Sequence, residues 1–148
     1  MTLSNKLNQI KTIFIDTAPI IYFIEAHPKF GPLTMEIVET FQTRKINAFS
    51  SVLTLTEVLS KPIETGDDKL AKRFSDFLKH GKNLKLIEVS MHIAEMAGKL
   101  RGQYPGFRTV DAIQLSVAID IGVDAFLTND AKLKQIQEIN ILFLKDYL

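Results

Sequence analysis

Short runs of strand length, the first of them fully apolar, alternate along this chain with segments in which apolar residues recur at helical spacing. The runs cover residues 12–15, 46–51, 84–89, 124–128 and 141–144, and each has the length of a buried strand. Strands that alternate with helices favour a parallel sheet with helices on both faces. We therefore expect an α/β fold, a three-layer α/β/α sandwich around a central, mainly parallel five-stranded sheet.

Several residues mark where the predicted helices begin and end. Ser90 can cap a helix at its start, and Gly122 can end one. A short helix is expected over residues 54–59, because Pro62 soon follows and disrupts helices. Residues 110–121 are apolar nearly all round, which predicts a buried helix.

The composition narrows the class of protein. The 148 residues predict a single domain spanning the whole chain, residues 1–148, with order beginning near residue 12. Cysteine is absent, which excludes disulfides, cysteine-bound metals and thiol nucleophiles. No apolar run is long enough to cross a membrane, and the first eleven residues lack the apolar segment of a signal peptide. We expect a cytoplasmic protein with no membrane partner.

Acidic residues stand where the predicted strands end. Asp16 follows the first apolar run directly, and Asp130 follows the fourth. Glu57 lies on the helix after the second run, and Asp111 opens the buried helix. Ligands of open parallel sheets bind in the crevice outside the carboxyl ends of the strands. We therefore expect these four acids to converge on one crevice.

Four clustered carboxylates would repel one another, and some would have to take up protons. A hard divalent cation removes this conflict, since Mg²⁺ and Mn²⁺ prefer oxygen ligands and are often held by a few carboxylates together with substrate phosphates. Such ions activate water and stabilise the leaving oxygen in phosphoryl displacement. The pattern predicts a Mg²⁺ or Mn²⁺ site for phosphodiester chemistry.

Each acid also has a structural interpretation. Thr54 and Glu57 match a capping box, and Asp111 in a first helical turn is favourable to the helix dipole. Asp130 suits a turn. Asp16 is the strongest candidate, because an acid between two apolar runs is costly without a partner or a purpose.

Four motifs in order resemble those of the PIN-domain ribonuclease family, most closely the VapC-type toxins of toxin–antitoxin modules. They are FIDTAPIIYFIE, SSVLTLTEVLSKPI, TVDAIQLSVAI and AFLTND. The resemblance implies a PIN-like fold and an endoribonuclease that hydrolyses phosphodiester bonds of single-stranded RNA. It also implies that the catalytic metal ligands are Asp16, Glu57, Asp111 and Asp130, with Mg²⁺ or Mn²⁺ as cofactor.

Further residues near these acids are candidates for supporting roles. Thr17 and Thr128 match small hydroxyl positions beside the acids of the family, although a helix N-cap and a turn residue would account for them equally well. Arg101 and Arg108 lie near Asp111 in the sequence and are candidates to bind substrate phosphate.

The segment 20–41 predicts how the protein assembles. It is rich in large apolar residues, and some of them, such as Ile21, Tyr22 and Met35, fall off the two helical stripes expected to cover the sheet. Exposed apolar patches of this kind usually mark interfaces. We expect a homodimer, and the resemblance adds a possible cognate antitoxin protein as partner.

Other functions remain open at this point. A phosphoacceptor receiver domain would need paired acids after the first strand, but Thr17 follows Asp16. A haloacid-dehalogenase-like phosphatase would need a second acid at position 18, which is alanine. The remaining alternatives are a stand-alone PIN nuclease of RNA processing and a catalytically idle PIN-like module that binds protein or RNA.

Overall fold

A five-stranded sheet forms the centre of the computed structural model, which describes residues 1–43 and 45–148. The strands are β1 (Thr12–Ile15), β2 (Asn47–Ser51), β3 (Leu84–Ile87), β4 (Ala125–Thr128) and β5 (Ile141–Phe143). Their order is β3-β2-β1-β4-β5, and every neighbouring pair is parallel. The predicted α/β fold is confirmed, and the sheet is parallel throughout these strands.

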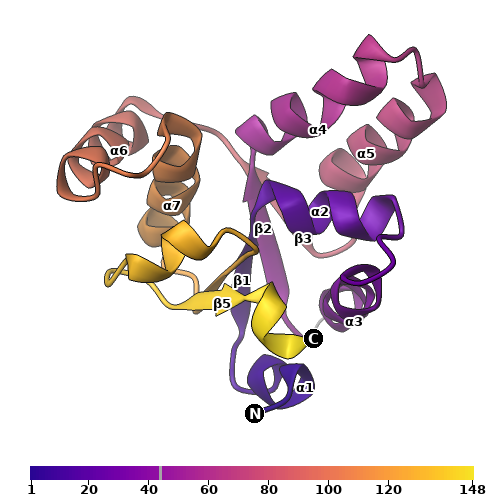
Figure 1. Ribbon diagram of the computed structural model, residues 1–148, viewed down its shortest axis with the longest axis horizontal. Helices are drawn as coiled ribbons and strands as arrows, with labels where there is room; N and C mark the ends of the chain where they lie inside the picture. Colours follow the sequence, from indigo (N-terminus) through magenta and orange to yellow (C-terminus); the bar gives the residue numbers. More distant parts are fainter. Residues whose placement is uncertain (44) are drawn as a thin grey trace.

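Helices cover both faces of the sheet (Figure 1). The helices are α1 (Leu3–Leu7), α2 (Thr17–Ile24), α3 (Gly31–Gln42), α4 (Val52–Glu64), α5 (Asp68–His80), α6 (Met91–Gln103) and α7 (Thr109–Ile121), with short 3₁₀ helices η1 (Ala131–Gln135) and η2 (Leu144–Tyr147). Helices α6 and α7 pack on one face, and α1 to α5 lie on the other. No helix in the two described ranges is long and apolar enough to cross a membrane.

Alternate side chains of the central strands supply two separate cores. Ile13 and Ile15 of β1 pack with the helices α1 to α5, whereas Phe14 points to the α6–α7 side. Phe14 stacks there on Phe126 of β4, with ring centroids 5.1 Å apart. This alternation follows from the two-residue period of a strand, and it explains why Ile13, Phe14 and Ile15 are all apolar although they face opposite sides.

Two of the expected helix boundaries are confirmed. The Ser90 hydroxyl accepts a hydrogen bond from the backbone N–H of Ile93 at the start of α6. Gly122 ends α7 with φ at 72°, a left-handed conformation that glycine adopts without strain. Seven residues of α7 are buried, as its all-round apolar pattern predicted.

The amino-terminal segment forms a helix, although order was expected to begin only near residue 12. The Thr2 hydroxyl accepts from the N–H of Asn5 and caps α1, and Leu3 and Leu7 are buried in the core. Burial of these two side chains stabilises a helix that is too short to form alone. The prediction was wrong because one turn of helix shows almost no periodicity.

Helix α4 is longer at both ends than the predicted 54–59. It begins at Val52, because the Ser51 hydroxyl caps it by accepting from the N–H of Leu53 at 3.2 Å. It continues through the buried Pro62 to Glu64. Proline removes one helical hydrogen bond, but burial of its ring and the short distance to the helix end make this loss tolerable here.

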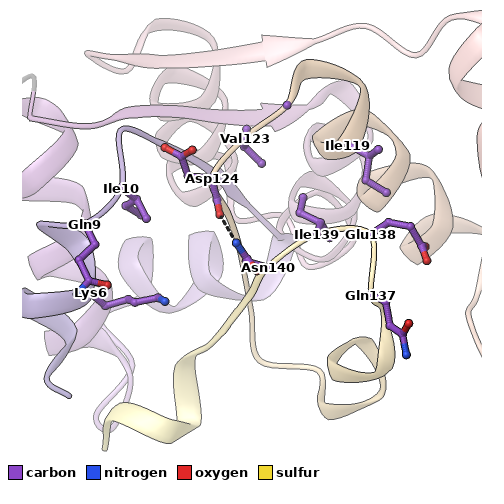
Figure 2. A pocket seen from close by; sticks show the side chains of 11 residues that line it. Lys6, Gln9, Ile10, Ile119, Val123, Asp124, Gln137, Glu138, Ile139 and Asn140 are labelled. Atoms are coloured by element: carbon purple, nitrogen blue, oxygen red, sulfur yellow. Dashed lines mark hydrogen bonds between the residues drawn. The ribbon is translucent and has the colours of Figure 1, made fainter.

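A recess of about 460 Å³ opens at the amino-terminal ends of the strands (Figure 2). Asp124 faces it, but its carboxylate accepts hydrogen bonds from the backbone N–H groups of Lys11 and Thr12, at 2.7 and 3.1 Å. These bonds lower the pKa of Asp124. The carboxylate thus joins the starts of β1 and β4 and has a structural role at this edge of the sheet.

Candidate functional site

The opposite edge of the sheet carries a pocket of about 390 Å³ into which all four predicted acids converge. Asp16 stands between β1 and α2, and Glu57 comes from α4. Asp111 lies in the first turn of α7, and Asp130 follows β4 at the start of η1. The parallel order of the strands brings these segments together, although they are far apart in the sequence.

Asp16 occupies the end of β1 and caps α2. One carboxylate oxygen accepts from the N–H of Thr17 at 2.9 Å, and the other accepts from the hydroxyl of Thr128 at 2.8 Å. Burial raises the pKa of Asp16 to about 6, and the nearby carboxylates of Asp111 and Glu57 add to this effect, although the two hydrogen bonds oppose it. Negative charge at this position is therefore only partly compensated by the protein.

Glu57 faces the pocket and does not cap its own helix. Its Oε1 atom accepts from the hydroxyl of Thr17 at 2.6 Å. The capping-box interpretation is wrong, because α4 begins before Thr54 and is capped by Ser51. Thr17 is likewise no N-cap, since Asp16 takes that place. Its hydroxyl instead joins the first turn of α2 to the acid on α4.

Asp111 is almost completely buried and is held by Arg108. The guanidinium donates to both carboxylate oxygens, at 3.1 and 3.2 Å, and the backbone N–H of Arg108 donates a third bond at 3.1 Å. The Asp111 side chain is 5% exposed and that of Arg108 is 65% exposed. The carboxylate raises the pKa of Arg108. Asp111 therefore lies in the first turn of α7, where an acid favours the helix dipole, accepts from the N-cap backbone of that helix and also belongs to the pocket.

Thr128 connects Asp16 to Asp130. Its buried hydroxyl donates to Asp16 and accepts from the backbone N–H of Asp130 at 3.1 Å. The Asp130 carboxylate caps η1 by accepting from the N–H of Lys132 at 3.0 Å. The turn chemistry expected of Asp130 is present, and the same turn places its side chain at the pocket.

The two arginine candidates differ in their position. Arg108 lines the pocket, whereas Arg101 does not. Arg101 donates from Nε to the carbonyl oxygen of Phe107 and from a terminal nitrogen to the hydroxyl of Thr109, at 3.3 and 2.9 Å. These bonds hold the connection between α6 and α7, so Arg101 has a structural role there.

Some lining residues were not foreseen from the sequence. They are Ala18, Ile21, Asn129 and Ala131. Asn129 donates to the hydroxyl of Tyr22 at 3.2 Å and accepts from the N–H of Lys145 at 3.2 Å. It thereby fixes the end of β4 against α2 and η2. Its position beside Asp130, at the end of a strand, was the available signal.

The donor set of this pocket fits a hard divalent cation. Four carboxylates and two hydroxyls line it, and Mg²⁺ and Mn²⁺ prefer such oxygen ligands. The pKa of Asp16 is raised because burial and the neighbouring acids disfavour its ionised form, and a bound cation would stabilise that form. Among the described residues no three acidic or histidine side chains are already spaced to hold an ion. Arg108 and Thr17 instead occupy oxygens of Asp111 and Glu57.

Solved structures with the same fold include toxin–antitoxin proteins. A VapBC2 complex from Rickettsia felis bound to a promoter DNA fragment aligns with a TM-score of 0.72 and 19% identity, over 89% of this chain and 98% of that chain. A toxin–antitoxin complex from Klebsiella pneumoniae aligns with a TM-score of 0.65 and 18% identity, over 89% and 97%. VapC20 from Mycobacterium tuberculosis, described as a sarcin–ricin loop cleaving toxin, aligns with a TM-score of 0.68 and 14% identity, over 86% and 98%.

The family comparison covers most of the chain. No curated protein matches, whereas the family model described as the PIN domain matches residues 13–139. That range includes all four acids of the pocket. The fold, the order of the acid-bearing segments and this match agree, and the chain belongs to the PIN domain family.

Proposed function

We propose that this protein is a metal-dependent endoribonuclease that hydrolyses phosphodiester bonds of single-stranded RNA, and that it is the toxin of a toxin–antitoxin pair. The observation that carries the proposal is the convergence of Asp16, Glu57, Asp111 and Asp130 on one pocket. The uncompensated charge at Asp16 supports it. The VapBC proteins among the structures of the same fold support the toxin role.

The four carboxylates would hold Mg²⁺ or Mn²⁺, which supplies water activation and charge stabilisation in phosphodiester hydrolysis. The hydroxyls of Thr17 and Thr128 orient Glu57 and Asp16 through hydrogen bonds. Ligand side chains fixed in this way lose less freedom when an ion binds. These two threonines therefore prepare the acids for the ion.

Arg108 is the candidate for phosphate binding. Its side chain is largely exposed while its guanidinium touches the pocket. A planar guanidinium suits the paired oxygens of a phosphate as well as those of a carboxylate. The same group therefore can exchange Asp111 for an RNA phosphate. Arg101 is assigned no such contact, because it holds the α6–α7 connection.

Purified protein should cut an end-labelled single-stranded RNA in the presence of Mg²⁺ or Mn²⁺. We expect internal cleavage that stops with excess EDTA and returns when the ion is restored, because four carboxylates without a cation repel the anionic phosphodiester and cannot stabilise the charge that develops on it. A hairpin RNA with one single-stranded loop should be cut in the loop and not in the stem. Gel electrophoresis of the labelled products measures both the rate and the position of cutting.

Other results of this assay would point to other functions. RNA that is bound but never cut, with Mn²⁺ binding intact, would indicate an idle RNA-binding module. Active cleavage, combined with the finding that no short reading frame lies next to the gene, would favour a stand-alone nuclease of RNA processing. Cleavage that persists in EDTA would contradict the metal-dependent mechanism.

The proposed partners are a second copy of this chain and a cognate antitoxin. An apolar recess of about 320 Å³ lies between the end of α2 and the start of α3, and Met35 beside it is 51% exposed. Tyr22 contributes less to this exposed apolar surface than the sequence indicated, because its ring stacks on Phe30 of the same chain. The recess and Met35 support an interface that involves only part of the 20–41 segment.

Light scattering at micromolar concentration tests the homodimer. We expect about twice the chain mass of 16.7 kDa, because a dimer interface would cover Met35 and the recess beside it. Met35→Glu should reduce the mass to the monomer value without loss of helical signal. A monomeric wild-type protein would contradict the homodimer and leave the patch to a different partner.

A further inference from the structure

A chain of buried hydrogen bonds connects the segments that carry three of the acids. It consists of the side chains of Ser50, Ser51, Thr54 and Gln114, each with 0% exposure. The first two residues end β2, Thr54 lies in the first turn of α4, and Gln114 lies on α7. Buried polar groups are costly unless they are paired, so four of them together in an apolar interior call for an explanation.

The hydroxyl hydrogens in this chain can be assigned. The Ser50 hydroxyl donates to the carbonyl oxygen of Ile15 at 2.9 Å. Its contact with Thr54 at 2.8 Å must therefore have Thr54 as the donor. Gln114 donates from Nε2 to Thr54 at 2.8 Å, and the Ser51 hydroxyl donates to Oε1 of Gln114. Each hydroxyl thus donates once, and the bonds run in one direction from Ser51 to Ile15.

The members of this chain stand at fixed offsets from the acids. Thr54 precedes Glu57 by three residues on α4, and Gln114 follows Asp111 by three residues on α7. Residues three apart share one face of a helix. The bond between Thr54 and Gln114 therefore joins α4 to α7 one turn away from their two carboxylates.

The same chain also reaches the third acid. Its last acceptor is the carbonyl of Ile15, the residue immediately before Asp16. The end of β1, directly before Asp16, is thus joined to α4 and α7, which carry Glu57 and Asp111, by one continuous set of hydrogen bonds. A packed interior alone would hold these segments together, but it would not fix their register as closely as directed bonds do.

We infer that Gln114 and Thr54 are positioning residues that set the spacing of Asp16, Glu57 and Asp111 for the metal ion. This inference rests on the proposed function, because it assumes that the four acids bind a metal ion. Groups that orient metal ligands typically change metal affinity by about 10- to 100-fold when they are replaced. Gln114 touches no substrate or ion, and its effect passes through the helix that carries Asp111.

The test is the affinity of the full chain for Mn²⁺, measured from the free-ion signal in electron paramagnetic resonance. Gln114→Met keeps the length of the side chain but removes its hydrogen bonds, and we expect Mn²⁺ affinity to fall by about 10- to 100-fold. The control is Leu142→Ala on the edge strand β5, where Leu142 is buried in the core. It should lower the melting temperature and leave Mn²⁺ affinity within about twofold of the wild type.

A second variant separates positioning from stability. Thr54→Val combined with Gln114→Met removes both partners of the central bond, and such paired replacement often restores stability. We expect the double variant to melt at or above the temperature of the single variant while its Mn²⁺ affinity stays low. Wild-type affinity in either variant, or an equal loss of affinity in Leu142→Ala, would overturn the inference.

The outcome also distinguishes this inference from the proposed function. Asp111→Asn serves as the reference for loss of the site itself. A wild-type protein whose Mn²⁺ binding does not depend on Asp111 would overturn the metal site and the positioning role together. Wild-type binding that is lost in Asp111→Asn but retained in Gln114→Met would overturn the positioning role alone.

Discussion

Asp16→Asn should reduce metal-dependent RNA cleavage by about 10²- to 10³-fold, the size typical of removing one preorganised electrostatic group from an active site. The same variant should be more stable than the wild type in the absence of metal. Asparagine keeps the volume and can still cap α2 through its side-chain oxygen. It removes a charge that burial and the neighbouring acids Asp111 and Glu57 disfavour.

The stability gain depends on pH in a direction set by the shifted pKa. The folded protein raises the pKa of Asp16 from 3.8 to about 6, so between these values the folded state binds more protons than the unfolded state. The stability of the wild type therefore falls as pH rises through this window. The advantage of the Asp16→Asn variant should be full above about pH 6, at roughly 1–3 kcal/mol, and should disappear near pH 4.

Thermal melts in EDTA at a series of pH values, together with the cleavage assay, measure both effects. Asp124→Asn is the matched control, because Asp124 lies at the opposite edge of the sheet and has its pKa lowered by backbone hydrogen bonds. That control should lose stability at neutral pH and retain cleavage. An Asp16→Asn protein that cuts RNA at the normal rate would remove Asp16 from the mechanism.

The sequence was sufficient for the sheet and for the positions of the acids. Strands such as 12–15 are apolar on both faces because both faces are covered, and Asp16 stands out at the end of such a run. The parallel sheet then places Asp130, at the end of another strand, on the same edge. These features are local and periodic, which is why they can be read without a structure.

Other features depend on contacts between distant segments. The fold of α1 depends on burial of Leu3 and Leu7 against helices that come later in the chain. The roles of Arg101 and Arg108 differ because Arg101 bonds to the α6–α7 connection, whereas Arg108 bonds to Asp111 in the pocket. Gln114 carried a usable signal, since it is a polar residue in an apolar helix, three positions after Asp111. Its partner Thr54 carried none of its own, because its spacing to Glu57 also matches a helix cap.

Arg108→Gln should have opposite effects on ion binding and on RNA binding. In the wild type the guanidinium supplies two of the three hydrogen bonds to the buried carboxylate of Asp111. Its loss removes the cation that pairs with this charge and should lower the metal-free stability by about 2 kcal/mol. This is less than for a fully buried pair, because the Arg108 side chain is 65% exposed.

The same interaction must be given up when an ion binds Asp111 in the wild type. Without it, Mn²⁺ should bind about 30-fold more tightly, the factor that corresponds to about 2 kcal/mol. Single-stranded RNA should bind more weakly at saturating Mn²⁺, because the phosphate loses its guanidinium partner. Added Mn²⁺ should therefore raise the melting temperature of the variant by more than that of the wild type.

Three measurements on one pair of variants decide this prediction: Mn²⁺ titration, thermal melts with and without the ion, and RNA binding by fluorescence anisotropy. Arg101→Gln is the control, because Arg101 bonds to Phe107 and Thr109 outside the pocket. It should lower stability and leave Mn²⁺ affinity unchanged. If Arg108→Gln binds Mn²⁺ more weakly than the wild type, Arg108 holds Asp111 in place for the ion and does not compete with it.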